Sequence, residues 1–247
     1  MNGNKLESME KGGRILGQIL QDLKTKTSPG MATKSLDDMT RRLCLRYGVK
    51  PSFLGYQEYP ASVCVSINNE VVHGIPGERQ LKDGDIISLD LGVYFQGFHT
   101  DAAITFSLGN LSPKNEKLIQ VTKEALMMGI GEAICDKRIG DIGYSIQNFV
   151  EQSGFNIVRT LVGHSIGRKI HEEPLIPNFG HKNSGQIIQK GMTLAIEPMV
   201  TTGDSAVFLA DDGWTYKTTD GSIASHFEHT IYVTDGKPII LTNNNPS

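Results

Sequence analysis

Apolar residues recur at helical spacing near the start of the chain. Residues 9–23 place Ile15, Leu16, Ile19, Leu20 and Leu23 on one side of a helix. A turn at Ser28-Pro29-Gly30 should end this segment. Thr33 is expected to act as the N-cap of a second helix that runs to about Tyr47 and stops before Gly48. Extended segments are predicted over residues 61–67, 85–94 and 97–108.

The same order of elements returns after Ser112-Pro113. Residues 115–133 and 139–152 are predicted to be helices, and Met127 and Met128 on the first of them are expected in the core. Further extended segments are predicted around 156–162 and over 192–201, 213–218 and 225–233. Helix, helix and then strands in each half indicate an internal duplication. Helices grouped ahead of strands favour an α+β sheet with helices on one face.

The composition is that of an ordinary globular protein, and it limits the cellular compartments in which the protein is expected. The 247 residues fit one large domain or two fused half-domains. A net charge of −3 gives no electrostatic case for nucleic acid, and no Gly-rich phosphate loop supports nucleotide binding. The three cysteines, at positions 44, 64 and 135, form no metal or disulfide pattern. No apolar run suits a signal peptide or a membrane span, so we expect a cytoplasmic protein.

Four carboxylates stand among apolar, strand-forming residues: Asp90, Asp101, Glu197 and Glu228. A lone buried carboxylate is costly, although Asp90 taken alone could equally cap a turn or pair with a lysine. If the four converged, they would repel one another and raise one another's pKa. A pair of divalent cations reverses that cost, with one histidine completing the ligands.

Eight short motifs, in order along the chain, resemble the type I methionine aminopeptidases. They are GYQEYP at 55–60, HGIP at 73–76, DLG at 90–92, HTD at 99–101, GHSIG at 163–167, HEEP at 171–174, IEPM at 196–199 and FEHT at 227–230. The resemblance implies a pita-bread (creatinase/aminopeptidase) fold, in which two pseudo-symmetric halves share a curved antiparallel sheet covered by helices. We therefore expect a single catalytic domain over residues 1–247, with halves of about 1–110 and 111–247.

The resemblance also implies a site for two divalent metal ions, which could be Co, Mn, Fe or Zn. Asp90 would be the two-oxygen ligand of one ion, Asp101 and Glu228 would bridge both ions, and His164 and Glu197 would bind the other. His73 and His171 match the family histidines that contact substrate without holding metal. The implied pocket for the methionine side chain is formed by Phe53, Tyr56, Tyr59, Cys64 and Trp214. Ordinary core packing is the alternative for these aromatic residues, above all for Trp214.

The implied activity is removal of the initiator methionine from nascent polypeptides when the second residue is small. A hydroxide bound to both metals would attack the scissile carbonyl, and Glu197 would carry the proton to the leaving nitrogen. His171 would hydrogen-bond the oxyanion and His73 the scissile nitrogen. The expected partners are the N-termini of nascent chains, with no nucleic acid and no membrane. We expect a monomer, and a ribosome contact is left open.

Four residues depart from the family pattern. Phe53 stands where many relatives have a small residue, Glu58 where glycine is usual, Ile170 where an aromatic residue is common and His226 where glutamine is common. The larger residue at Phe53 and the smaller residue at Ile170 are expected to compensate for each other in the volume of the pocket. None of the four is expected to touch a metal ligand.

Three rival functions share the fold. Xaa-Pro aminopeptidases and prolidases usually carry an additional N-terminal domain, whereas this chain begins almost directly at the catalytic fold. Type II methionine aminopeptidases have a long insertion between the last two glutamates, which here are only 31 positions apart (228 − 197). A non-catalytic binding protein should have lost ligands, and all five are present.

Overall fold

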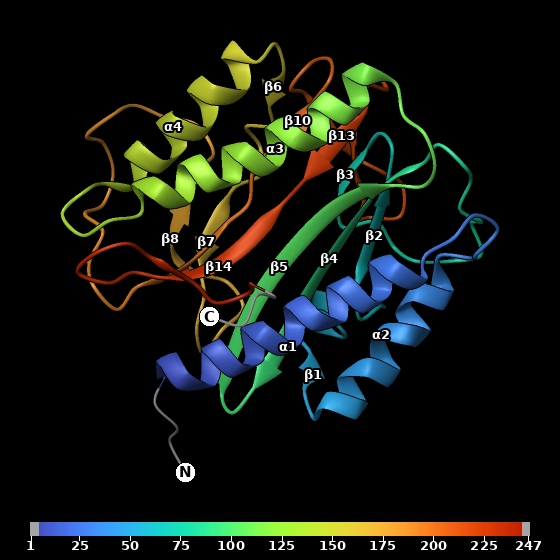
Figure 1. The fold of residues 1–247 in the computed structure, drawn as a ribbon, viewed down its shortest axis with the longest axis horizontal. Coiled ribbons are helices and arrows are strands. Elements are labelled where there is room, and N and C mark those ends of the chain that lie inside the picture. Colours follow the sequence, from blue (N-terminus) through green and yellow to red (C-terminus); the bar gives the residue numbers. More distant parts are fainter. Residues whose placement is uncertain (1–4, 244–247) are drawn as a thin grey trace.

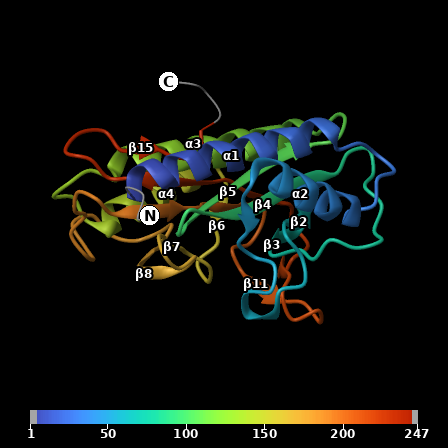
Figure 2. The ribbon, with the colours of Figure 1, turned by 90° about the horizontal axis from the view of Figure 1, so that it is seen from below.

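Helices lie on one face of a curved sheet in the computed structural model, which describes residues 5–243 (Figure 1). The helices are α1 (Lys5–Lys26), α2 (Lys34–Tyr47), α3 (Pro113–Glu132) and α4 (Ile139–Gln152), and η1 (Tyr56–Glu58) is a short 3-10 turn. Figure 2 separates the layers, with the long helices above the sheet and irregular segments below it. Within residues 5–243, no helix is long and apolar enough to cross a bilayer.

The main sheet is antiparallel and crosses the boundary between the two halves. Its strands follow the order β1 (Lys50–Pro51), β4 (Ile86–Phe95), β5 (Phe98–Ser107), β14 (Glu228–Tyr232), β9 (Thr193–Ile196), β7 (Gly163–Ser165) and β8 (Glu172–Ile176). In addition, β2 (Cys64–Ile67) pairs with β4, and β15 (Ile239–Ile240) pairs with β14. Because β5 pairs with β14, one continuous sheet carries residues from both halves.

Two smaller sheets stand beside the main one. The first contains β13 (Ala224–His226), β10 (Met199–Thr201) and β6 (Asn156–Ile157), and the second contains β11 (Val207–Leu209), β12 (Tyr216–Thr218) and β3 (Glu70–Val72). The extended segments predicted over 192–201 and 225–233 are each divided between the main sheet and a small one. Pro198, which has no N–H to donate, lies at one of these breaks. Glu197 therefore sits at a corner where the chain leaves the main sheet.

Local sequence accounts for most helix ends, with one exception. Gly48 ends α2 in a left-handed conformation (φ 69°), and its N–H bonds to the carbonyls of the last turn. Ser112 begins α3, because its side chain accepts a hydrogen bond from the N–H of Asn115. Thr33 precedes α2 as predicted but does not cap it with its side chain. Instead, its hydroxyl donates to the carbonyl of Gly77 and accepts from the Gly77 N–H, so it ties the helix start to a distant loop.

The core fills the space between the helices and the sheet. The apolar face of α1 packs with α2, β2, β4 and β5. In the other half, α3 packs over β9 and β14, and α4 packs against α3, β6 and β8. The expectation that Met127 and Met128 belong to this core is wrong, since they are 47% and 49% exposed. Leu126 and Ile130 form the buried face of α3 instead, so the two methionines lie on its outer side.

Gly13 offers a test of how closely α1 is packed. A Cβ at this buried helix position would lie 2.3 Å from the carbonyl oxygen of Leu241, a backbone atom that cannot easily move. We expect Gly13→Ala to lower the free energy of unfolding by about 1–3 kcal/mol or more through this clash. Gly131→Ala is the control, because that exposed position in α3 has open space and alanine favours the helix by up to about 1 kcal/mol. Urea unfolding of both variants measures the difference, and equal stabilities would contradict the packing described here.

Candidate metal centre and substrate pocket

The register of the central strands places three acidic residues on one face of the sheet. In β4 and β5, Asp90 lies directly opposite Ala103, and Glu228 of β14 lies opposite the same Ala103 from the other side. Directly opposed residues share a face, and so do residues two apart in one strand. Asp101, two positions before Ala103, therefore points to the same side as Asp90 and Glu228.

The same reasoning brings in the two remaining predicted ligands. His164 of β7 lies opposite Ala195 of β9, and Ala195 lies opposite Thr230, two positions after Glu228. Glu197 follows Ala195 by two positions at the end of β9. All five side chains thus belong to one face, and the apolar neighbours Leu89 and Leu91 of Asp90 point into the core beneath the helices.

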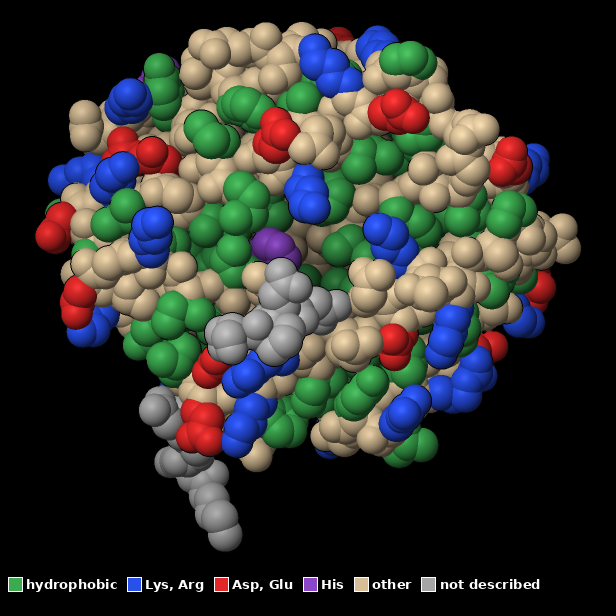
Figure 3. Space-filling model, viewed as in Figure 1, with side chains coloured by type: hydrophobic (Ala, Val, Ile, Leu, Met, Phe, Trp, Pro, Cys, Tyr) green, Lys and Arg blue, Asp and Glu red, His purple; other side chains and the backbone are tan. Residues whose placement is uncertain are grey.

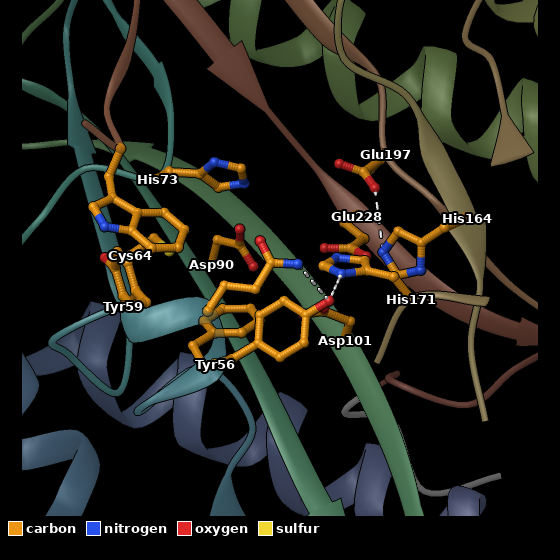
Figure 4. Close-up of a pocket in the computed structure, with 13 residues that line it drawn as sticks. Tyr56, Tyr59, Cys64, His73, Asp90, Asp101, His164, His171, Glu197 and Glu228 are labelled. Carbon is orange, nitrogen blue, oxygen red and sulfur yellow. Dashed lines mark hydrogen bonds and ion pairs between the residues drawn. The ribbon is translucent and has the colours of Figure 1, made fainter. Parts of the chain in front are cut away.

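These residues meet in one pocket below the sheet (Figure 4). The structure brings together every residue that the sequence assigned to the site, from segments spread over residues 53–228. The lining consists of Phe53, Tyr56, Gln57, Tyr59, Cys64, His73, Asp90, Asp101, His164, His171, Glu197, Trp214 and Glu228. Only Gln57 in this set was not anticipated, and its neighbours Tyr56 and Tyr59 in the same loop are the signal that points to it.

Asp90, Asp101 and Glu228 are buried, the Glu197 side chain is 13% exposed, and all four hold protons more strongly than free acids. Burial is the largest cause in each case, and it raises the pKa of Asp90, Glu197 and Glu228 well above the ordinary range. The negative charge of Asp101 raises these three pKa values further. Burial also raises the pKa of Asp101, to about 7. A site of this kind favours either protons or cations.

Unpaired oxygen atoms show that the site fits divalent metal. Asp90 Oδ1, Asp101 Oδ1 and Glu228 Oε1 are buried and have no hydrogen-bond partner within residues 5–243. One ligand atom each from Asp101, His164 and Glu228 lie within 4.8 Å of one another. Buried polar atoms are rarely left unpaired, and carboxylate oxygens with an imidazole nitrogen are donors that divalent metals accept.

His164 is prepared to offer a free nitrogen. Its Nδ1 lies 3.0 Å from the carbonyl oxygen of Ser165, and a carbonyl can only accept, so Nδ1 carries the hydrogen. The lone pair is then on Nε2, which faces Glu197 Oε1 at 3.6 Å. Burial lowers the pKa of His164 to about 3, so the ring is neutral at physiological pH, as metal binding requires.

Two further histidines border the site without belonging to the ligand group. The His171 ring lies 4.3 Å from that of His164, and its Nδ1 is 2.9 Å from the hydroxyl of Tyr56. His73 has a left-handed backbone (φ 60°), and its ring lies edge-on to Trp214. Burial lowers the pKa of His73 to about 4. Both rings can therefore donate a hydrogen bond into the pocket without carrying a charge.

The other end of the pocket is apolar and aromatic. Tyr59 contacts Phe53 and Trp214 edge-on, at ring-centre distances of 6.5 and 5.1 Å, and its hydroxyl donates to the carbonyl of Gly74. Phe53 and Ile170 pack in the same cluster with Tyr59 and Cys64. The two departures from the family pattern thus belong to one cluster, in which Phe53 lines the pocket and Ile170 packs behind it. Their effect on the volume of the pocket stays a prediction.

His226 contradicts the expectation that no departure from the family pattern touches a predicted metal ligand. It is 1% exposed, and its Nε2 lies 3.6 Å from Glu197 Oε2. The signal was available in the sequence, because His226 precedes Glu228 by two positions and so shares its side of the chain. His229, by contrast, is turned away and bonds through Nδ1 to Thr242 Oγ1 at 2.8 Å.

The helix-covered face has a mixed charge pattern (Figure 3). Lysine and arginine side chains are interspersed with aspartate and glutamate across this view, and apolar side chains lie between them.

Known proteins with similar sequences and structures agree with this architecture. Residues 7–235 match metallopeptidase family M24. Methionine aminopeptidase of Clostridium perfringens is 48% identical over 241 residues, which cover 98% of this chain and 97% of that protein. The crystal structure of methionine aminopeptidase from Thermotoga maritima is 41% identical and matches with a TM-score of 0.96 over 98% of this chain and 99% of that one.

A more distant relative shares the fold at low sequence identity. Prolidase from Pyrococcus furiosus is 17% identical and has a TM-score of 0.80, so the likeness shows the fold alone. It covers 98% of this chain but 64% of the prolidase. The expected pita-bread fold is therefore confirmed, and the chain belongs to metallopeptidase family M24 and, within it, to the methionine aminopeptidases.

Proposed function

We propose that this chain removes the initiator methionine from nascent polypeptides whose second residue is small. One observation carries the proposal: five potential metal ligands converge on one face of the sheet, directly beside an aromatic, apolar pocket. The ligands suit divalent metal, and the pocket suits an unbranched apolar side chain. The ligands and the pocket together account for metal-assisted peptide hydrolysis and for the selection of an N-terminal methionine.

The proposed ligand set assigns two metal ions to the five residues. Asp90, Asp101 and Glu228 would hold one ion, and Asp101, Glu228, His164 and Glu197 would hold the other. The unpaired oxygens of Asp90, Asp101 and Glu228 support this assignment. Four carboxylates carry more negative charge than one divalent ion neutralises, which favours two ions. Mn, Fe, Co and Zn all accept such mixed oxygen and nitrogen ligands.

When bound, the metal ions supply a hydroxide nucleophile near neutral pH and polarise the scissile carbonyl. The surrounding side chains manage the protons and the developing charge. Glu197 takes the proton of the nucleophile and passes it to the leaving nitrogen. His171, whose Nδ1 is engaged by Tyr56, presents Nε2 to the oxyanion, and His73 holds the scissile nitrogen.

Selectivity for methionine rests on the aromatic end of the pocket. A thioether interacts favourably with aromatic ring edges and fills irregular apolar space. Tyr59, Trp214 and Cys64 provide such walls. The turn before Trp214 is fixed by Asp212, whose carboxylate accepts from the N–H groups of Trp214 and Thr215. The loop therefore fixes the backbone position from which the indole extends.

The rival functions differ in specific features of the chain. Between Glu197 and Glu228 the structure contains only short strands and loops, with no inserted helical subdomain of the type II kind. An Xaa-Pro peptidase would use the same metals with another pocket, and a non-catalytic protein would bind metal without turnover. A cytoplasmic location, a monomeric state and a ribosome contact stay predictions.

Metal add-back to the metal-free protein tests the function. We expect no cleavage of Met-Ala-Ser without metal, and activity with at least one of Co²⁺, Mn²⁺, Fe²⁺ and Zn²⁺. Met-Leu-Ser should be refused, because the proposed function requires a small second residue, and an Ala-Pro peptide should be a poor substrate. Kinetic constants for the three peptides decide the matter. Preference for the Ala-Pro peptide would favour the prolidase alternative, and inactivity with every metal would favour a binding protein.

Two substitutions separate ligand from oxyanion donor. Asp101→Asn should abolish activity and two-ion binding, because Asp101 serves both ions. His171→Ala should keep both ions and lower kcat by about two to three orders of magnitude, as for other oxyanion donors. Isothermal titration of Mn²⁺ into the metal-free variants gives the stoichiometry. Loss of an ion from His171→Ala would make that residue a ligand, and full activity of Asp101→Asn would remove Asp101 from the site.

The metal-free protein should lose stability as the pH rises from about 6.5 to about 8. The folded protein keeps protons on Asp90, Glu197 and Glu228, whose pKa values are raised well above the ordinary range, whereas the unfolded chain releases them. Stability falls with pH wherever the folded state binds more protons. Below about pH 6.5 the buried histidines, which the unfolded chain protonates, oppose this trend.

Thermal melting of the metal-free protein across this range measures the effect. Glu228→Gln should flatten the decline, since it removes one of the titrating groups. Saturating Mn²⁺ should remove the decline or reverse it, because metal binding requires the ionised carboxylates. A melting temperature that rises with pH in the metal-free protein would show that these carboxylates are ionised without metal.

A further inference from the structure

His226 is a buried imidazole that the proposed chemistry leaves without a role. Its side chain is 1% exposed, and neither ring nitrogen has a hydrogen-bond partner within residues 5–243. It does not line the pocket, so it cannot touch the substrate. Burial of an unpaired polar group is costly, which indicates that the ring acquires a partner when the site is in use.

The backbone of His226 is firmly held, so its side chain has a fixed origin. Its N–H donates to Thr105 Oγ1 at 3.0 Å, and the same hydroxyl lies 2.6 Å from its carbonyl oxygen. Ser88 Oγ lies 2.8 Å from Thr105 Oγ1 and continues this connection to β4. The short strand β13 is thereby tied to the two central strands that carry Asp90 and Asp101.

Glu197 lies between two imidazoles. Its Oε1 is 3.6 Å from His164 Nε2, and its Oε2 is 3.6 Å from His226 Nε2. Asn178 Nδ2 donates to the backbone carbonyl of Glu197 at 3.1 Å. His164 borders the pocket, whereas His226 approaches the carboxylate from behind. The distances exceed a formed hydrogen bond, and such contacts often tighten only in the loaded enzyme.

We propose that His226 is a positioning residue that donates a hydrogen bond from Nε2 to Glu197 Oε2 and so fixes the direction of that carboxylate. An ionised carboxylate only accepts hydrogen bonds, so the ring nitrogen that faces it carries the hydrogen. With one oxygen held from behind, the other stays directed at the metal centre and the transferred proton. The inference rests on the proposed function, because it assigns His226 a part in the work of Glu197.

Three variants at this position distinguish the loss of a hydrogen-bond donor from a change in side-chain shape. His226→Met keeps the bulk and removes the donor, and His226→Leu does the same if the methionine variant does not fold. His226→Gln keeps an N–H donor on a flexible side chain. His229→Gln is the matched control, because it changes a half-buried histidine in the next strand that bonds to Thr242, away from the pocket.

His226→Met should lower kcat for Met-Ala-Ser by about 10–100-fold with little change in KM, and weaken Mn²⁺ binding to the metal-free protein by a similar factor. His226→Gln should stay within a few-fold of wild type, and His229→Gln should match wild type in both measurements. Unchanged kcat and Mn²⁺ affinity in His226→Met would overturn the proposal. Equal losses in the Met and Gln variants would also overturn it, because shape and not a donor would then matter.

Two other outcomes are distinguishable. Loss of one whole Mn²⁺ ion from His226→Met, with the second retained, would make His226 a ligand and refute its role as a positioning residue. If the wild-type protein fails to cleave Met-Ala-Ser with any metal, the proposed function falls. In that case the Mn²⁺ titration of the same variants tests the inference without reference to activity. Weaker binding in His226→Met with recovery in His226→Gln supports the inference, and equal binding refutes it.

Discussion

Three buried carboxylates and the largely buried Glu197 share one face of the sheet, and no lysine or arginine among the described residues forms an ion pair with any of the four. The rest of the structure depends on this arrangement. Left ionised and unpaired, such groups would oppose folding strongly. Protons relieve the cost in part, which is why burial raises their pKa values. Divalent ions relieve it more fully, because they replace mutual repulsion with shared attraction. The arrangement that makes the burial of these carboxylates unfavourable therefore also makes the site suitable for divalent metal ions.

The sheet tolerates these carboxylates because one of its faces packs against the apolar core while the other face forms the site. Alternation along each strand sends Leu89 and Leu91 under the helices and Asp90 into the site. The β4–β5 connection is a tight turn at Gln96-Gly97, where both residues have positive φ (48° and 95°), and it fixes the register between Asp90 and Asp101. A shift of one residue would exchange the ligands for core residues. The apolar face thus stabilises the register on which the polar face depends.

Catalytic precision depends on side chains that do not themselves meet the reacting atoms. Tyr56 engages Nδ1 of His171 from a loop in which Gln57 and Glu58 both have positive φ, and Asp212 holds the turn that presents Trp214. His226 approaches Glu197 from a second, smaller sheet. Each support comes from a different segment, so the metal site and the pocket for methionine are positioned together by the surrounding loops and short strands. Outer contacts of this kind commonly matter by one or two orders of magnitude in metal affinity or rate.

The sequence determined the elements with strong local signals. The helical face of residues 9–23, the end of α2 at Gly48 and the start of α3 at Ser112-Pro113 follow from periodicity and from capping chemistry that neighbouring residues supply. The order of the motifs also indicated the family, and that resemblance implied a set of five metal ligands, which stays a prediction. These features depend on residues close together in the chain, so local reasoning reaches them.

Only the tertiary structure decided the features that depend on distant residues. Thr33 bonds to Gly77 across the fold instead of capping its helix, and Met127 and Met128 face outward because the core takes the other side of α3. The break at Glu197-Pro198 moves the chain into a second sheet, and that sheet brings His226 to Glu197. Strand register, which joins residues more than a hundred positions apart, brings the five predicted ligands to one face of the sheet. Sequence patterns specify which face a residue occupies within its own strand, but the pairing of strands decides which residues meet there.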